Sequence, residues 1–164
     1  MKKETYIKMT QPFREHPEVA RGLHITNRIC MLIMYVCYPS LLVFLLIKKE
    51  EILTEVFLIP AISFVLLSIG RYFINRKRPY EAFDIPPVIS KKTKGKSFPS
   101  RHVFSATIIA MTFLVMSPWA WLGILLLGVT LLEALVRVLS GVHYISDVVA
   151  GIVVGVLASL LYLI

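Results

Sequence analysis

Long apolar stretches alternate with short polar segments along most of the chain. Residues 29–47 carry no charged side chain. As a helix they would extend about 28 Å, which is enough to cross the hydrocarbon core of a bilayer. Four more apolar stretches follow, and the third of the five is the shortest. The pattern therefore predicts five membrane-spanning helices, at residues 29–47, 52–74, 102–116, 119–138 and 147–164.

The first 28 residues follow a different pattern, in which apolar side chains such as Phe13 lie among six Lys and Arg residues. Pro12 and Pro17 are expected to interrupt any long helix in this segment. A mixed basic and apolar segment suits the membrane interface. We therefore expect an interfacial N-terminal arm or helix at residues 1–28 and a single transmembrane domain at residues 29–164, in an all-α fold.

Composition agrees with this interpretation. Of the 164 residues, 57% are hydrophobic and 17% are charged, and the mean hydropathy is +0.74, which is too apolar for a soluble domain of this size. The net charge is +8, but the basic residues border apolar stretches, so anionic lipid is a better partner than nucleic acid. We expect a multi-pass protein of the cell membrane, whose oligomeric state the pattern leaves open.

Because each crossing reverses the side of the membrane, five spans bring four helix ends to the same side. These are the end of the second span, the start of the third, the end of the fourth and the start of the fifth. The polar residues at these ends are Arg71, Arg78, Ser100, Arg101, His102, Arg137, His143 and Asp147. The sequence therefore predicts one site, assembled on one side of the membrane.

The residue types at this site suit a phosphate group, because several arginines would attract an anion and repel a metal cation. In His143-x-x-x-Asp147 the carboxylate follows the imidazole by one helical turn. It can therefore accept the Nδ1 proton and leave Nε2 free to attack phosphorus. We expect His143 to be the nucleophile, Asp147 to orient it and His102 to supply a separate acid.

Guanidinium groups and backbone amides would neutralise the phosphate oxygens. The expected cations are Arg71, Arg78, Arg101 and Arg137. Ser100 is expected to cap the helix that follows it, so that the first N–H groups of that helix point at the anion. Glu133 lies four residues before Arg137 and is expected to hold that arginine in place.

Three segments, in order, resemble the motifs of the phosphatidic acid phosphatase type 2 superfamily. Arg71-x6-Arg78-Pro79 resembles the first motif, Pro99-Ser100-Arg101-His102 the second, and Arg137-x5-His143-x3-Asp147 the third. The resemblance covers roughly residues 56–164. It implies an all-helical fold and metal-independent hydrolysis of phosphomonoesters or pyrophosphates through a phosphohistidine.

Three positions depart from the usual motifs of this superfamily. Arg71 replaces a Lys, Arg101 replaces a Gly, and Val136 replaces a Ser that usually precedes the third-motif arginine. None of these changes removes a catalytic group. Membrane members commonly have six spans, so the segment 1–28 is expected to stand in for a missing helix.

The leading hypothesis is a metal-independent lipid phosphatase. Its substrate would be phosphatidylglycerophosphate, phosphatidate or a polyprenyl diphosphate, entering sideways from the bilayer, with no cofactor and no nucleic-acid partner. The main alternative is a protein that binds or flips a phosphate-bearing lipid without turnover. Zinc held by the two histidines and a carboxylate is a further alternative that the arginines oppose, and a haloperoxidase is the most distant one.

The basic residues also predict an orientation. Sixteen of the 18 Lys and Arg residues lie on the side of the expected site, and only Lys48 and Lys49 lie opposite. The positive-inside rule places the site in the cytoplasm, although many membrane members of the resembled family face outward. We expect the lysines of segment 91–96 to bind anionic headgroups nonspecifically and leave them outside the site.

Overall fold

The computed structural model describes residues 1–91 and 93–164, so Lys92 of the expected headgroup-binding loop lies outside the described residues. The elements are α1 (Lys3–Glu15), α2 (Pro17–Lys48), α3 (Leu53–Ile74), α4 (Pro79–Phe83), α5 (Arg101–Met116), α6 (Ala120–Leu139), α7 (Ile145–Ser159) and the 3-10 turn η1 (Leu160–Leu163). The described ranges contain no strand. The predicted all-α class is confirmed.

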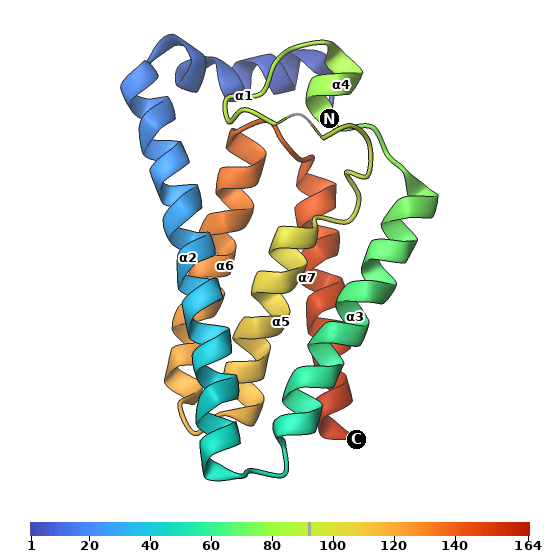
Figure 1. Ribbon diagram of the computed structural model, residues 1–164. Coiled ribbons are helices and arrows are strands. Elements are labelled where there is room, and N and C mark those ends of the chain that lie inside the picture. Colours follow the sequence, from blue (N-terminus) through green and yellow to red (C-terminus); the bar gives the residue numbers. More distant parts are fainter. Residues whose placement is uncertain (92) are drawn as a thin grey trace.

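The long helices α2, α3, α5, α6 and α7 run up and down in a bundle, and α1 and α4 lie across one end of it (Figure 1). Within the described residues, four helical stretches are long and apolar enough to cross a membrane, and α5 is a shorter apolar helix. α5 packs mainly against α6 and α7 and carries eight buried residues. The shortest predicted span is therefore the central helix of the bundle.

The first span begins earlier than expected. α2 starts at Pro17 rather than at residue 29, because proline is well tolerated at the first helical position, where no N–H partner is needed. The break lies at His16, whose extended backbone (φ −121°, ψ 96°) separates α1 from α2, as expected for a residue before proline. Pro12 does not interrupt α1, and its ring is exposed.

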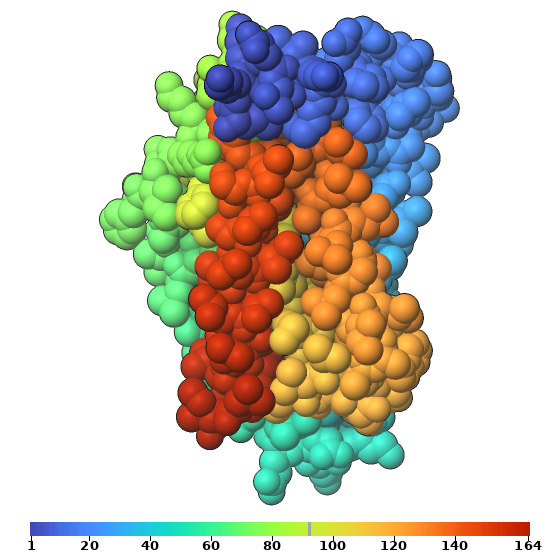
Figure 2. Space-filling model, turned by 180° about the vertical axis from the view of Figure 1, so that it is seen from behind, coloured from blue at the N-terminus to red at the C-terminus, as the bar shows by residue number. Residues whose placement is uncertain are grey.

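α1 lies over the ends of α6 and α7, which Figure 2 shows from behind. Its Tyr6 and Thr10 side chains are buried, whereas Lys2, Lys3 and Lys8 are exposed. α1 is therefore amphipathic, with its inner face on the bundle and its charges outside.

Close helix contacts position the start of α5 against α7. A Cβ on Gly151 would lie 2.8 Å from the Ser100 carbonyl oxygen, and one on Gly155 would lie 2.7 Å from Thr107 Cβ. The Ser100 N–H donates to the Asp147 carbonyl at 2.8 Å. Two predicted site residues are therefore joined directly through the backbone.

The outward faces of the bundle are apolar, as expected for contact with acyl chains. Large exposed hydrophobic side chains are found on each of α2, α3, α6 and α7, for example Leu32, Phe73, Leu131 and Leu157. With the lengths of the helices, these faces confirm the prediction of a multi-pass membrane protein.

Candidate active site

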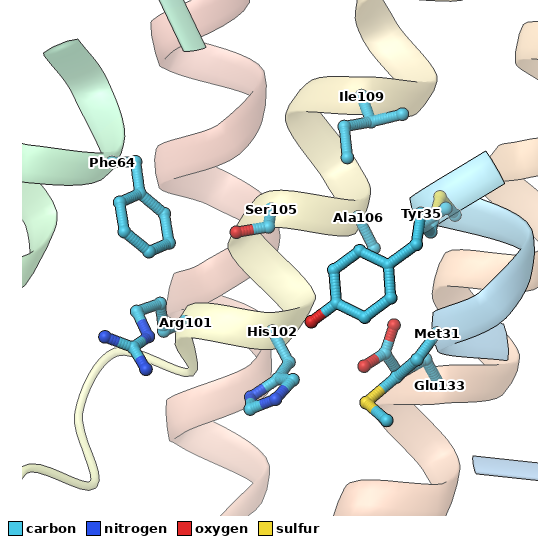
Figure 3. A pocket seen from close by; sticks show the side chains of 10 residues that line it. Met31, Tyr35, Phe64, Arg101, His102, Ser105, Ala106, Ile109 and Glu133 are labelled. Carbon is cyan, nitrogen blue, oxygen red and sulfur yellow. The ribbon is translucent and has the colours of Figure 1, made fainter. Parts of the chain in front are cut away.

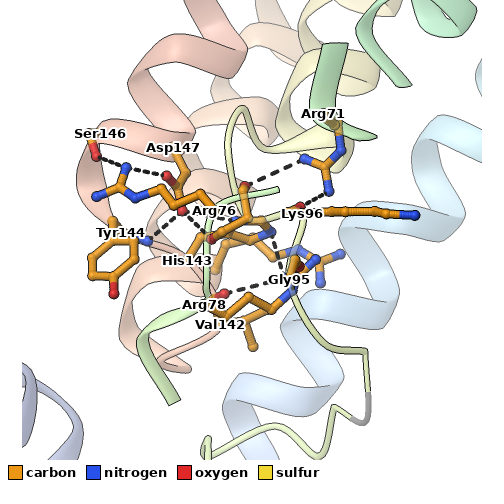
Figure 4. A network of polar contacts seen from close by, with 12 residues as sticks. Arg71, Arg76, Arg78, Gly95, Lys96, Val142, His143, Tyr144, Ser146 and Asp147 are labelled. Carbon is orange, nitrogen blue, oxygen red and sulfur yellow. Dashed lines mark hydrogen bonds and ion pairs between the residues drawn. The ribbon is translucent and has the colours of Figure 1, made fainter. Parts of the chain in front are cut away.

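The predicted site residues lie at the end of the bundle that α1 and α4 cover, where four helix ends meet (Figure 1). Arg71 is in the last turn of α3, Arg137 in the last turn of α6, and Asp147 in the first turn of α7. His143 lies in the short loop between α6 and α7. Figure 4 shows how Arg71, His143 and Asp147 form one polar network with the loop before α5.

His143 and Asp147 contact each other as their spacing predicts. The Nδ1 atom of His143 lies 3.3 Å from Asp147 Oδ2, and both side chains are buried. Asp147 is at the third position of α7, so its carboxylate also accepts the N–H of Tyr144, the residue before the helix, at 3.0 Å. The helix start therefore fixes the carboxylate, and the carboxylate fixes the imidazole.

The surroundings of His143 keep its imidazole neutral. Burial lowers the pKa of His143 to about 4; the hydrogen bond that His143 donates to Asp147 opposes this shift, and the nearby charges of Arg78 and Arg137 add to it. With the Nδ1 proton directed to Asp147, Nε2 carries the lone pair. In the structure this lone pair accepts a hydrogen bond from Arg78 Nη1 at 3.2 Å, so Arg78 lies beside the nucleophilic atom and can turn to an oxygen of a bound phosphate.

Arg76 is a site residue that the sequence reasoning missed. Its Nη1 lies 2.8 Å from Asp147 Oδ1 and 2.9 Å from Ser146 Oγ. Its guanidinium carbon lies 4.1 Å from the centre of the Tyr144 ring. The only signal in the sequence is the position of Arg76 between the two first-motif arginines.

Ser97 was missed as well. Its hydroxyl donates to Asp147 Oδ2 and lies 3.4 Å from His143 Nδ1. Its carbonyl accepts a hydrogen bond from Arg71 Nη1 at 3.4 Å. Ser97 therefore joins the arginines to the His–Asp pair, from a loop that has no periodic pattern.

Backbone carbonyls hold the two first-motif arginines. Arg71 Nη2 donates to the Lys96 carbonyl, Arg78 Nε to the Gly95 carbonyl at 3.1 Å, and Arg78 Nη1 to the Val142 carbonyl at 3.3 Å. Both guanidiniums are buried, and neither forms an ion pair with a carboxylate among the residues that the structure describes. Buried cations without a counter-ion favour an anionic ligand.

Arg137 has a partner on its own helix. Its Nη2 lies 3.3 Å from Glu133 Oε1, and both side chains are buried, which confirms the contact expected from the four-residue spacing. The Nε atom of Arg137 is buried and has no partner within the described ranges. A hydrogen-bond donor therefore remains free at the end of α6.

The prediction that the Ser100 side chain caps α5 is wrong. Ser100 does stand at the N-cap position, but its hydroxyl makes no capping bond. Its backbone is held instead by the N–H bond to Asp147 and by its carbonyl, which accepts the Phe104 N–H at 3.0 Å. The buried hydroxyl has no partner in the part of the chain that the structure describes, so it stays available to an anion at the start of the helix.

His102 lines a cavity of about 220 Å³. α2, α3, α5 and α6 line this cavity, mostly with apolar side chains, and Figure 3 shows Tyr35 and Glu133 facing it beside His102. The Arg101 side chain is exposed and lies over Phe64, 5.3 Å from the ring centre. The structure thus places Arg101 at the cavity and apart from the His143 network.

The lysines of the 91–96 segment do not all behave alike. Lys94 and Lys96 are exposed, as expected for a loop at the membrane surface, but Lys91 is half-buried. Burial lowers the pKa of Lys91, and the charges of four site arginines, Arg137 foremost, lower it further. Lys91 therefore lies close enough to the site for its arginines to act on it, which the sequence did not lead us to expect.

Comparison with known proteins agrees with the geometry. The family model described as the PAP2 superfamily matches residues 52–164. An undecaprenyl-diphosphatase of Sulfolobus acidocaldarius is 30% identical over 125 residues, which is 74% of this chain and 59% of that protein. The chain thus spans less than two thirds of the length of this relative.

Two crystal structures share the fold. Aquifex aeolicus LpxE superposes with a TM-score of 0.73 at 23% identity, over 98% of this chain and 93% of that one. The first transmembrane PAP2 type phosphatidylglycerolphosphate phosphatase from Bacillus subtilis superposes with a TM-score of 0.70 at 20% identity, over 96% and 82% of the two chains.

Proposed function

The chain belongs to the PAP2 superfamily, and on this basis we propose that it hydrolyses a phosphate ester or diphosphate carried by a membrane lipid. Membership confirms the resemblance inferred from the three motifs. The observation that carries the proposal is a buried, neutral His143, with Nδ1 on Asp147 and Nε2 facing Arg78. A lone pair aimed into a cluster of buried cations suits attack on a phosphoryl group.

The proposed reaction has two steps. In the first, His143 Nε2 forms a bond to phosphorus, the bond to the leaving oxygen breaks, and protonated His102 gives its proton to that oxygen. In the second, His102 removes a proton from water, the hydroxide attacks phosphorus, and the bond to Nε2 breaks to release phosphate. Asp147 holds the imidazole in one tautomer throughout.

The remaining groups would bind the phosphate oxygens. The guanidiniums of Arg71, Arg78 and Arg137, the free hydroxyl of Ser100 and the first N–H groups of α5 converge at this end of the bundle. These charges act as magnesium does in other phosphoryl-transfer sites. We therefore expect hydrolysis without a divalent metal.

The cavity beside His102 supports a lipid substrate, because apolar side chains from α2 and α3 line it. A lipid could enter sideways, with its phosphate at His102 and its chain between these helices. The candidate substrates are phosphatidylglycerophosphate, phosphatidate and a polyprenyl diphosphate. Among these, the name of the undecaprenyl-diphosphatase relative supports a polyprenyl diphosphate as the substrate.

The test is phosphate release by the purified protein in detergent, with phosphatidate, phosphatidylglycerophosphate and undecaprenyl diphosphate as substrates. We expect release from at least one lipid, full activity in EDTA, and none from the His143→Ala variant. Tight lipid binding without release from any of the three would favour the alternative of a binding or flipping protein. Activity that is lost in EDTA and restored by magnesium would contradict the proposal that the arginines neutralise the phosphate without a metal.

A further inference from the structure

α1 lies outside the segment that matches the family model, yet one of its side chains contacts the loop that carries His143. Tyr6 is fully buried. Its hydroxyl lies 3.3 Å from the Gly141 carbonyl oxygen and 3.5 Å from that of Ile85, and Arg14 Nη2 donates to it at 3.5 Å. The hydroxyl can therefore donate to the loop while it accepts from α1 itself.

The loop is shaped to receive this tyrosine. Gly141 has a φ of +72°, and a Cβ at this position would lie 2.9 Å from two carbons of the Tyr6 ring. Two residues later, the N–H of His143 donates to the Arg137 carbonyl at 3.3 Å. The position of the imidazole thus depends on a tight turn whose outer side rests on Tyr6.

A second set of contacts joins Tyr6 to the carboxylate that orients His143. The Tyr6 ring centre is 5.3 Å from that of Phe83, which is 6.4 Å from that of Tyr144. Tyr144 in turn lies under the Arg76 guanidinium, which binds Asp147 Oδ1 at 2.8 Å. Tyr6 therefore supports both the turn before the imidazole and the partner of Asp147.

We propose that α1 is a working part of the active site and that Tyr6 is a positioning residue for His143. This inference rests on the proposed function. Tyr6 touches neither the cavity beside His102 nor any of the phosphate-binding cations, so its loss should leave substrate binding intact. Attack on phosphorus is sensitive to small displacements of the nucleophile, so the loss of Tyr6 should slow the chemical step.

The first experiment compares Tyr6→Leu and Tyr6→Phe with Tyr162→Phe in the full-length protein. Tyr162 is a matched control, because it is also buried and its hydroxyl lies 2.7 Å from Thr112 Oγ1 at the opposite end of the bundle. For Tyr6→Leu we expect kcat to fall between about 10-fold and 100-fold while KM changes less than about 2-fold. Tyr6→Phe should show a smaller loss of kcat, and Tyr162→Phe should lower the thermal midpoint without changing kcat.

A second measurement separates positioning from general loss of stability. Gly141→Ala places a methyl group against the Tyr6 ring, so it should lower kcat strongly in the wild-type background. In the Tyr6→Leu background the ring is absent, and the double variant should be faster than Gly141→Ala alone. The strained φ remains in both backgrounds, so only the contact with Tyr6 differs.

The outcomes are distinct. Wild-type kcat in a folded Tyr6→Leu protein, a rise in KM at unchanged kcat, or equal effects of Gly141→Ala in both backgrounds would each overturn the inference and leave the proposed function standing. A wild-type protein that releases no phosphate from any lipid would overturn the proposed function and this inference with it.

Discussion

The two histidines of the site have different surroundings, and their removal should have different kinetic effects. His143 is enclosed by Asp147, Ser97 and Arg78. His102 lines the cavity that would hold the lipid. In the proposed mechanism the first histidine forms the bond to phosphorus, and the second gives a proton to the leaving oxygen.

The loss of activity in His102→Ala should therefore depend on the leaving group of the substrate. An alkyl alkoxide needs a proton as it departs, so we expect a loss of about 10²–10⁴-fold in kcat/KM for a lipid phosphate ester. A nitrophenolate leaves without help, so the loss on nitrophenyl phosphate should be much smaller. Equal losses on the two substrates would remove His102 from the role of acid.

The protonation of His143 gives a prediction about pH. Burial lowers the pKa of His143 to about 4, below the usual value for a histidine of about 6.5. The imidazole should stay neutral and nucleophilic from neutral pH down to about pH 4, and it should be lost as a nucleophile below that. Between pH 6.5 and pH 4, His143 is protonated in the unfolded chain but not in the folded protein. His143 therefore makes folding less favourable as the pH falls from about 6.5 to about 4.

NMR of histidine-labelled protein in detergent can measure this titration directly. The signal that disappears in His143→Ala identifies the residue, and Asp147→Asn should move its midpoint further down, because the hydrogen bond to Asp147 raises the pKa. A midpoint at about pH 6 or above in the wild-type protein would contradict the buried, neutral nucleophile.

For contacts between individual residues, the sequence predicted those between positions four residues apart and missed those made by loops. Glu133 and Arg137 are four residues apart on α6, so one helical turn brings them together. His143 and Asp147 have the same spacing, but His143 lies in the loop before α7, so Asp147 in the first turn of that helix reaches back to it. Ser97 reaches Asp147 across 50 residues, which no periodic pattern reveals. Ser100 shows the opposite failure: it stands at the N-cap position that the sequence predicts, but its hydroxyl makes no capping bond.

Among the elements, the predicted spans from the second to the fifth begin within two residues of the observed helices. Hydropathy detects them because the apolar stretches begin close to where these helices begin. It could not detect the start of α2, since residues 17–28 are polar enough for the interface and continue the same helix. At residue 29 the side chains change from polar to apolar, but the helix continues without a break.

The packing of α5 against α7 gives a prediction at the scale of elements. A Cβ on Gly151 would lie 2.8 Å from the Ser100 carbonyl oxygen and 3.3 Å from the Phe104 nitrogen. Both are backbone atoms, so Gly151→Ala should push α7 away from the start of α5. We expect a loss of about 1–3 kcal/mol in stability and a fall in phosphate release, because Ser100 and Asp147 meet at this contact.

Gly128→Ala is the matched control, because nothing lies within 4 Å of a Cβ at that position in α6. It should be neutral or should stabilise the helix by about 0.5–1 kcal/mol, with unchanged activity. Thermal unfolding and phosphate release are measured for both variants. Wild-type activity in Gly151→Ala would show that this contact does not hold the site together.

For the whole molecule, the bundle places α1 and the site at one end and the turn between α2 and α3 at the other (Figure 1). The topology follows from counting spans, so the sequence predicted which helix ends share a side. It did not predict that α1 folds back over the loop before α7, because that contact depends on tertiary packing of Tyr6 and Met9.

This arrangement places 16 of the 18 Lys and Arg residues at the site end or in the arm above it. We expect the site to face the cytoplasm, which would favour a glycerophospholipid substrate made on the inner leaflet. Single cysteines at exposed Ser90 and Glu50 test this, in a chain lacking Cys30 and Cys37. An impermeant thiol reagent should label position 50, and not position 90, in intact cells.

The reverse labelling pattern would invert the orientation. It would place the site outside the cell and make a polyprenyl diphosphate the better substrate.

In the proposed reaction, His143 carries the phosphoryl group during turnover. The direct test is to mix the protein with a lipid substrate labelled in its terminal phosphate and to quench the reaction rapidly. The protein is then analysed for bound phosphate that is stable in base and labile in acid, and mass spectrometry of its peptides locates the label. We expect phosphohistidine at His143 in the wild-type protein and none in His143→Ala. Labelled phosphate on another residue, or the same phosphohistidine persisting in His143→Ala, would contradict this role of His143.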